Sequence, residues 1–233
     1  MGERHIASVS WGKDSLCMLL RLIAERRPLD EVVFYDTGME FQAIYSARDK
    51  VLPLLRAHRI KYTELKPERS FLWNMFERPV NEGKPNEHCG YSWCGGRCRW
   101  GTTEKLKALD KYCRGAVVYV GIAHDETDRL KKEHAPNKRF PLADWKICEG
   151  EALIYCYQHG FWWEEGGRHL YAHLDRVSCW CCTNKNLKEL RHYHRYLPEY
   201  WERLKELQRQ TDRPMKGAGK SVFDLEEKFK SEE

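Results

Sequence analysis

The stretch of residues 6–23 constrains the fold more than any other part of this 233-residue sequence. An apolar, β-prone run at residues 6–9 leads into a turn of small and polar residues, and leucines at helical spacing follow from Leu16. A strand, a tight turn and a helix in this order point the first backbone N–H groups of the helix at one spot beyond the strand end. These unpaired donors and the positive end of the helix dipole form an anion site.

The turn at residues 10–15, Ser-Trp-Gly-Lys-Asp-Ser, supplies the side chains for such a site. Gly12 lets the backbone approach an anion, Lys13 adds a positive charge, and Ser10 and Ser15 offer hydroxyl donors. The sequence therefore predicts a phosphate or sulfate site, and hence a nucleotide ligand. The alternative is an ordinary helix start that carries polar residues for local reasons. The turn is not a Gly-x-x-x-x-Gly-Lys-Ser/Thr loop, because no glycine precedes Gly12 at the required spacing.

Composition restricts the class of protein. A hydrophobic fraction of 42% is enough for one large domain or a domain with a small appendage, and a net charge of +5 suits an anionic ligand. The absence of a long apolar run or a signal-like segment predicts no membrane span and a cytoplasmic protein. Ten cysteines in a reducing compartment indicate metal ligation or redox chemistry rather than disulfides.

Strands and helices alternate along the first two thirds of the chain. Strand patterns occur at residues 31–38, 61–65 and 116–122, with an extended segment at 139–142, and helical patterns occur at 41–58, 103–111 and 149–160. This order predicts an α/β fold with a doubly wound parallel sheet. We expect a nucleotide-binding domain at residues 1–185, which includes a Cys-rich loop at 67–101, and a helical extension at 186–233.

Polar residues follow three of the predicted strands. They lie at residues 10–15, 36–38 and 121–126. Ligands of doubly wound sheets bind beyond the carboxyl ends of the strands, so these three segments are expected to face one crevice. Asp36, Thr37 and Gly38 also suit a simple turn, which is the structural alternative.

These motifs together resemble the phosphoadenosine phosphosulfate (PAPS) reductase branch of the adenine-nucleotide alpha hydrolases, the PP-loop superfamily. The resemblance is carried by Gly-Lys-Asp-Ser at residues 12–15, Asp-Thr-Gly at 36–38, Gly-Ile-Ala-His-Asp-Glu-Thr-Asp-Arg at 121–129 and Pro-Leu-Ala-Asp-Trp at 141–145. It runs from about residue 5 to about residue 190. Trp11 departs from the family pattern, which usually has a glycine there. An indole at this position would narrow the anion pocket or stack on a base.

The resemblance implies that ATP or a related adenylyl nucleotide binds with its phosphates on residues 10–15 and its adenine near residues 36–38. The implied nucleotide-binding residues are Ser8, Ser10, Gly12, Lys13, Asp14, Ser15, Asp36, Thr37, Gly38, Gly121 and Arg129. The implied catalytic residues are Lys13, Asp14, Asp125 and Glu126. The carboxylates of Asp14, Asp125 and Glu126 suit Mg²⁺, although acidic residues also occur at solvated helix starts.

Six of the ten cysteines are clustered. Cys94 and Cys98 form a C-x3-C pair, and Cys179 and Cys182 form a C-x2-C pair. Two close pairs from distant segments fit a four-thiolate site, which is either tetrahedral Zn²⁺ or an iron–sulfur cluster. Cys89 and Cys181 are spare ligands or reactive thiols. The remaining four, Cys17, Cys113, Cys148 and Cys156, are expected to be small buried hydrophobes.

The cysteine pattern is similar to that of assimilatory adenylyl-sulfate reductases, which hold a four-iron cluster with an early cysteine pair and a late C-x-x-C. The early pair is adjacent in those proteins but C-x3-C here. Residues 176–183 also look like a segment of DNA-phosphorothioation sulfurtransferases. This resemblance favours a [4Fe-4S] cluster over Zn²⁺. Sulfonucleotide reductases carry a further nucleophilic cysteine in a Glu-Cys-Gly-x-His segment, whereas no cysteine follows Cys182 in this sequence.

Three functions remain open from the sequence. The leading one is an ATP pyrophosphatase that adenylates a substrate and couples this step to sulfur transfer. Its sulfur acceptor would be a nucleic acid or a small molecule, its sulfur donor a cysteine desulfurase, and its assembly a homodimer. The second is a sulfonucleotide reductase that releases sulfite through Cys89 or Cys181. The third is a zinc-stabilised nucleic-acid-binding module, suggested by basic and aromatic residues interleaved at 191–196.

Overall fold

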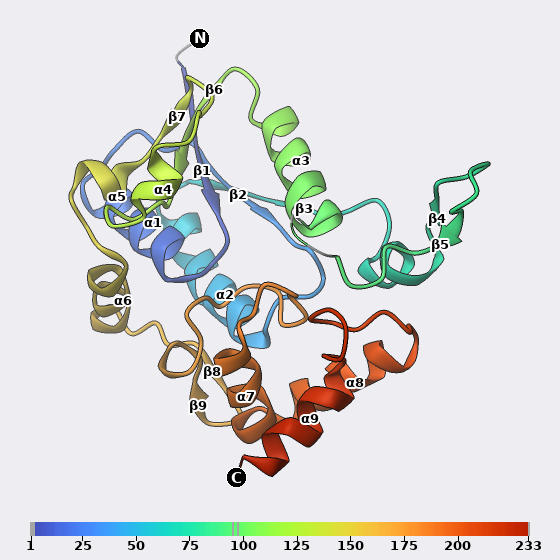
Figure 1. Cartoon of the computed structure of the whole chain (residues 1–233). Helices are drawn as coiled ribbons and strands as arrows, with labels where there is room; N and C mark the ends of the chain where they lie inside the picture. Colours follow the sequence, from blue (N-terminus) through green and yellow to red (C-terminus); the bar gives the residue numbers. More distant parts are fainter. Residues whose placement is uncertain (1–2, 95, 97, 233) are drawn as a thin grey trace. The chain divides into compact units, whose positions relative to one another are not determined.

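The computed structural model describes residues 3–94, 96 and 98–232, so two positions of the predicted Cys-rich loop, 95 and 97, lie outside the described residues. The chain forms two compact units (Figure 1). Unit 1 comprises Met1–Asp36, Phe41–Lys66 and Leu106–Trp163, and unit 2 comprises Thr37–Glu40, Pro67–Lys105 and Glu164–Glu233. The Cys-rich loop therefore groups with the C-terminal helices, unlike in the division at residue 185 drawn from the sequence.

Unit 1 is built on a five-stranded sheet. The strands are β1 (Arg4–Val9), β2 (Glu31–Tyr35), β3 (Lys61–Leu65), β6 (Ala116–Val120) and β7 (Lys138–Arg139). They pair in the order β3-β2-β1-β6-β7, and every pairing is parallel. The predicted α/β fold with a parallel sheet is confirmed.

The sheet reverses its winding direction between β1 and β6. The chain adds β2 and β3 on one side of β1, and then β6 and β7 on the other. Neighbouring parallel strands end at the same edge, so the segments after β1 and β6 flank the topological switch point. These are two of the three polar strand ends predicted from the sequence.

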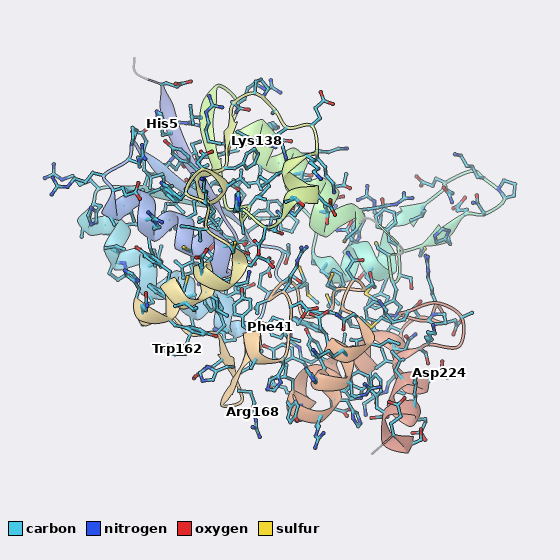
Figure 2. All side chains as sticks on the ribbon, turned by 60° about the vertical axis from the view of Figure 1, so that its left-hand side comes forward. His5, Phe41, Lys138, Trp162, Arg168 and Asp224 are labelled. Carbon is cyan, nitrogen blue, oxygen red and sulfur yellow. The ribbon has the colours of Figure 1, made fainter. Side chains whose placement is uncertain are left out.

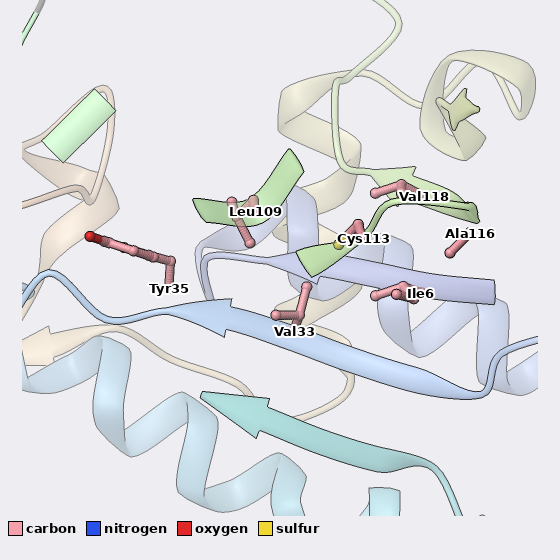
Figure 3. Packing of buried hydrophobic residues seen from close by; sticks show 7 residues of the cluster. All are labelled: Ile6, Val33, Tyr35, Leu109, Cys113, Ala116 and Val118. Carbon is pink, nitrogen blue, oxygen red and sulfur yellow. The ribbon is translucent and has the colours of Figure 1, made fainter. Parts of the chain in front are cut away.

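Helices cover the sheet because two parallel strands must be joined by a crossover connection, which is usually a helix. The helices of unit 1 are α1 (Lys13–Ala24), α2 (Gln42–Ala57), α3 (Lys105–Tyr112, of which Lys105 falls in unit 2), α4 (Thr127–Leu130), α5 (Pro141–Asp144) and α6 (Glu149–Gln158). Leu109 of α3 and the adjoining Cys113 pack on Ile6, Val33 and Val118, as Figure 3 shows. This apolar layer fixes α3 against one face of the sheet.

The extended segment expected at residues 139–142 is only half correct. Lys138 and Arg139 pair with β6, but Pro141 begins α5. Proline suits the first turn of a helix because its ring fixes a helical φ and its missing N–H would have no partner there.

Unit 2 carries the irregular and helical parts of the chain. Its described residues form two hairpins, β4 (Pro79–Val80) with β5 (His88–Cys89) and β8 (Glu164–Glu165) with β9 (Arg168–His169). They also form two short π-helices, η1 (Trp73–Glu77) and η2 (Arg99–Glu104), and a 3₁₀ turn, η3 (Leu170–Ala172). The predicted C-terminal helices are confirmed as α7 (Leu187–Tyr196), α8 (Pro198–Arg209) and α9 (Val222–Ser231), which pack on one another (Figure 1).

Local sequence sets where these helices begin. Asn186 and Glu189 form a reciprocal capping box at the start of α7, and Ser221 and Asp224 form another at α9. Pro198 occupies the first turn of α8. Among the described residues, no helix has the length and apolar character that crossing a bilayer requires.

Candidate functional site

The loop between β1 and α1 is held by its own serines. The Ser10 N–H donates to Ser15 Oγ (3.1 Å), and that hydroxyl donates to the carbonyl of Gly12 (3.1 Å). Gly12 is the N-cap of α1, and no side chain caps the helix start. The positive end of the α1 dipole is therefore left for a ligand at the switch point of the sheet.

Trp11 adopts a backbone conformation that ordinarily favours glycine. Its φ is 60°, in the left-handed region. The expectation that its indole narrows the anion pocket or stacks on a base is wrong, because the side chain is fully buried. Its ring contacts those of Phe34 and Tyr62, with centroids 6.1 and 5.9 Å away. The left-handed turn directs Cβ into the core, at a cost of about 1–3 kcal/mol in backbone strain that the packing offsets.

A second tryptophan holds this strained turn in place. Trp163 Nε1 donates to the carbonyl oxygen of Trp11 (2.8 Å), and both residues are buried. The adjacent Trp162, labelled in Figure 2, is 48% exposed and stacks on Tyr157 with ring centroids 4.1 Å apart. Only the inner tryptophan of the pair therefore supports the loop.

We expect Trp163→Phe to destabilise the chain by about 1–3 kcal/mol, because it leaves the buried Trp11 carbonyl without its donor. Affinity for ATP should fall as well, since the loop loses the bond that sets its shape. Urea unfolding and ATP titration measure the two effects. Trp162→Phe is the matched control and should change stability by less than about 0.5 kcal/mol. Equal effects of the two substitutions would contradict this role for Trp163.

Gly121 allows the end of β6 to lie directly against the start of α1. A Cβ atom at this position would stand 2.7 Å from Ser15 Cα and 2.8 Å from Ser15 N. Both are backbone atoms that cannot move aside, so the close approach requires glycine. Gly121 thus shapes the predicted nucleotide site through the backbone. Ser8 lies in β1, opposite Val33 and Val120.

A lysine and three carboxylates converge at the start of α1. The buried Lys13 Nζ lies 2.8 Å from Asp14 Oδ1 and 3.2 Å from Glu149 Oε1. Carboxylate oxygens of Asp14, Glu126 and Glu149 all lie within 4.8 Å of one another. Carboxylates at this spacing suit Mg²⁺, which takes one or two of them together with phosphate oxygens. The structure thus brings together three of the four predicted catalytic residues.

Glu149, rather than the predicted Asp125, lies in one cluster with Asp14 and Glu126. Asp125 Oδ1 accepts a hydrogen bond from the Glu149 N–H (3.0 Å), so it supports the start of α6. The sequence pattern does not single out Glu149, because it is simply an acidic residue at a helix start. Arg129, predicted to contact phosphate, binds both oxygens of Glu126 at 2.5 and 2.7 Å.

The shift in the pKa of Asp14 has the opposite sign to the one that is usual for a carboxylate in an ion pair. Burial raises the pKa of Asp14 above its ordinary value, Lys13 opposes the rise, and Glu149 and Glu126 add to it. An acid whose pKa is raised by folding costs stability above that pKa, and the cost disappears as the pH falls through it.

Asp14→Asn is therefore expected to leave the melting temperature at neutral pH unchanged or a few degrees higher in Mg²⁺-free buffer (about 2–4 °C for each kcal/mol). The same change should weaken Mg²⁺-dependent binding of ATP. Thermal melts with and without Mg²⁺ and ATP check both parts. A clear drop in melting temperature without Mg²⁺ would show that attraction to Lys13 outweighs burial.

The segment after β2 contributes to both units. Asp36 is buried in unit 1, where the Tyr45 hydroxyl donates to its Oδ1 (2.7 Å). Thr37 belongs to unit 2, and its Oγ1 donates to Glu40 Oε1 (3.0 Å) and lies 3.3 Å from Cys179 Sγ. Gly38 follows with φ 75°, a conformation that favours glycine. A residue predicted to bind nucleotide thus contacts a predicted metal ligand.

The two cysteine pairs come together in unit 2. A hydrogen bond from the Cys98 thiol lowers the pKa of Cys94 to about 6, and the charges of Arg213 and Arg99 act in the same direction. The same bond, together with burial, raises the pKa of Cys98, and Cys179 is close enough to contribute. Thr183, next to the late pair, donates its hydroxyl to the Cys94 carbonyl (2.8 Å).

The late pair, Cys179 and Cys182, is half-buried, as is the early pair. The Cys182 N–H donates to the Cys179 carbonyl (3.1 Å), which forms a tight turn. Burial raises the pKa of Cys179, and the charge of Glu40 adds to the rise. In the described part of the chain, no three of the sulfur atoms converge within 4.8 Å.

The other six cysteines differ in how much of the side chain is exposed to solvent. Cys181 is buried, and burial raises its pKa far above the ordinary value, so its thiol is unreactive. Cys89 is exposed on β5. The prediction of buried core cysteines is confirmed for Cys17, Cys113 and Cys156, whereas Cys148 is half-buried at the N-cap of α6.

A buried lysine adds positive charge beside the late cysteine pair. Lys185 is 3% exposed, and its Nζ contacts the Arg176 carbonyl and Glu189 Oε1. Burial lowers its pKa, while Glu189 and Cys182 oppose this effect. Sequence reasoning missed this lysine because nothing in its local pattern distinguishes it from a surface residue.

Comparison with known proteins shows the family to which this chain belongs. Residues 4–146, more than half of the chain, match the phosphoadenosine phosphosulfate reductase domain. The chain is 26% identical to the uncharacterized protein MJ0066 of Methanocaldococcus jannaschii and covers 41% of its length; 88% of the chain is aligned. It is 27% identical to an adenosine 5′-phosphosulfate reductase of Staphylococcus haemolyticus, with 69% of the chain aligned to 60% of that protein.

A solved structure also resembles the chain. The U34-tRNA thiolase NcsA from Methanococcus maripaludis, solved with its [4Fe-4S] cluster, aligns with 98% of this chain and 72% of its own at a TM-score of 0.49 and 13% identity. The domain match extends over β1, the loop that follows it, and the acidic segment after β6. The chain therefore belongs to the phosphoadenosine phosphosulfate reductase family.

Proposed function

We propose that this protein uses ATP to adenylate an acceptor and then transfers sulfur to it. The observation that carries the proposal is the buried Lys13 among Asp14, Glu126 and Glu149 at the start of α1, in a family whose fold binds nucleotides at this edge of the sheet. A separate group of thiols in unit 2 supports the sulfur chemistry.

In the first step, an acceptor oxygen attacks the α-phosphorus of ATP, and the bond between the α-phosphorus and the bridging oxygen to the β-phosphate breaks. Lys13 and the N–H groups at the start of α1 hold the departing pyrophosphate and stabilise the negative charge that develops on it. Asp14, Glu126 and Glu149 are the residues that would hold Mg²⁺. Asp36 marks the side of the crevice on which the adenine would lie.

We favour an iron–sulfur cluster over Zn²⁺ at the cysteine site, because an early cysteine pair followed by a late C-x-x-C resembles the pattern of adenylyl-sulfate reductases that hold a four-iron cluster. Cys94, Cys98, Cys179 and Cys182 would be the ligands, and positive side chains such as Lys185 and Arg213 would offset their charge. A bound [4Fe-4S] cluster would supply a site where inorganic sulfur is held or passed on.

The remaining components follow from this chemistry. The acceptor is a nucleic acid or a small molecule with a carbonyl or hydroxyl oxygen. A cysteine desulfurase would supply the sulfur as a persulfide, a thiol reductant would bring it to the sulfide level, and this sulfur would displace AMP from the adenylated acceptor. We expect the protein to act in the cytoplasm, where its thiols stay reduced, and to form a homodimer.

The test is an anaerobic preparation of the protein analysed for iron, sulfide and zinc and assayed for pyrophosphate release from ATP with nucleic acid as the acceptor. We expect iron and sulfide in about equal amounts, and pyrophosphate release that requires Mg²⁺. Zinc without iron would favour the zinc-stabilised binding module. Iron without any ATP-dependent pyrophosphate release would overturn the adenylation step.

A second candidate is sulfonucleotide reduction, which the adenosine 5′-phosphosulfate reductases among the relatives favour. This reaction needs an accessible thiolate to take the sulfite group. Cys181 is buried with a strongly raised pKa, so Cys89 is the better nucleophile of the two spare cysteines. Sulfite release from adenosine 5′-phosphosulfate in the presence of thioredoxin, lost in Cys89→Ser, would support this function instead.

A further inference from the structure

A small polar cavity adjoins the early cysteine pair. Its volume is about 210 Å³, and all of its lining residues belong to unit 2: Val80, Asn81, His88, Tyr91, Cys94, Arg99 and Arg213. They come from the β4–β5 hairpin, the loop after it, the start of η2 and the segment between α8 and α9. Segments far apart in the sequence therefore form one concave surface beside Cys94.

The charge of this cavity is positive. It is lined by two guanidinium groups, Arg99 and Arg213, and by no carboxylate among the residues described there. Neither guanidinium forms an ion pair with another described side chain, and both arginines are exposed. Arg99 lies over the Tyr91 ring, 5.2 Å from its centroid. Two unpaired arginines beside a phenol are suited to an oxyanion, because the planar guanidinium binds two oxygens of one phosphate at once.

His88 adds a third polar group. Its Nδ1 lies 2.9 Å from the carbonyl oxygen of Asn86, so Nδ1 carries a hydrogen, and Nε2 is the remaining polar atom of the ring.

We propose that this cavity binds a backbone phosphate of a nucleic-acid acceptor and so holds the acceptor beside the cysteine site. The inference rests on the proposed function and narrows its acceptor to a polynucleotide. Two exposed arginines in water hold a free small anion only weakly. A polyanion gains much more from the same contacts, because each neutralised phosphate releases condensed counterions. The cavity is also too small for a whole nucleotide to be enclosed, which suits one phosphate of a longer chain.

The experiment measures binding of a short fluorescein-labelled single strand, as RNA and as DNA of the same sequence, to the anaerobically purified holoprotein over a range of salt concentrations. Arg99→Gln and Arg213→Gln should each weaken binding several-fold and reduce the slope of log K against log salt by about 1. Lys220→Gln removes one exposed positive charge of unit 2 that does not line the cavity, and it should leave the slope unchanged.

Several results would overturn the proposal. They are an unchanged slope in both arginine variants, an equal change in Lys220→Gln, or displacement of the strand by inorganic phosphate at concentrations comparable to that of the strand. A preference for RNA or for DNA would support it and identify the acceptor class. Iron content and ATP affinity are measured on the same variants. If these are normal while nucleic-acid binding does not depend on either arginine, the proposed function stands and only this inference fails.

Discussion

Replacing Lys13 by alanine is expected to reduce ATP-dependent pyrophosphate release by about 10²–10³-fold, equivalent to about 2.7–4 kcal/mol of transition-state stabilisation. Lys13 Nζ is the positive group held between Asp14 and Glu149 at the start of α1. As pyrophosphate leaves, negative charge grows on its oxygens, and a buried ammonium stabilises this charge more than water does. Without it, the developing charge is left to the backbone donors of α1, the loop hydroxyls and Mg²⁺.

The readouts for Lys13→Ala are pyrophosphate release, ATP affinity and iron content. Iron should be retained, because the cysteine pairs belong to unit 2 and Lys13 to unit 1. Lys132→Ala is the control, since it removes an exposed lysine of unit 1. Circular dichroism shows whether each variant is folded. A Lys13→Ala protein that is folded and releases pyrophosphate at the normal rate would place the nucleotide chemistry elsewhere.

Replacing Cys179 by serine is expected to have the opposite effects to Lys13→Ala: loss of iron with ATP affinity retained. The anaerobically prepared protein should fall from about four iron atoms per chain to a small fraction of this and lose its brown colour, because a serine oxygen is a harder and poorer ligand for the cluster than a thiolate. Sulfur transfer should fall to background. ATP affinity should change little, since no nucleotide contact is assigned to Cys179.

Cys148→Ser is the matched control for this experiment. Cys148 is a half-buried thiol of unit 1 at the N-cap of α6, a position that serine suits, so iron content should be unchanged. Full iron in Cys179→Ser would mean that Cys181 or Cys89 completes the site in its place. Loss of both iron and ATP affinity would show that the two sites are not separable.

The sheet and its switch point could be predicted from the sequence because they depend on local patterns. The runs at residues 32–35 and 116–120 are apolar throughout, which is typical of strands buried on both faces, and the Gly-Lys-Asp-Ser turn lies between a strand and a helix. These signals need no knowledge of distant residues.

The details of the candidate site could not be predicted because they depend on tertiary contacts. Glu149 lies near Asp14 only because α6 packs on α1. Thr37 contacts Cys179 only because residues 37–40 belong to the same compact unit as the late cysteine pair. The prediction for the Trp11 side chain was wrong for a different reason. Its side-chain direction is set by a left-handed φ, which a tryptophan in a sequence does not reveal.

The tryptophan in the turn after β1 has a consequence for how this protein tolerates change. A glycine there would leave the ligand-binding backbone free to adjust independently of the interior. Here the same peptide carries one of the largest wholly enclosed rings among the described residues, so neighbours such as Phe34 and Tyr62 help to determine where the amides of the proposed phosphate site point. Substitutions that only loosen hydrophobic packing should therefore also alter nucleotide recognition, although none of the altered atoms touches the nucleotide.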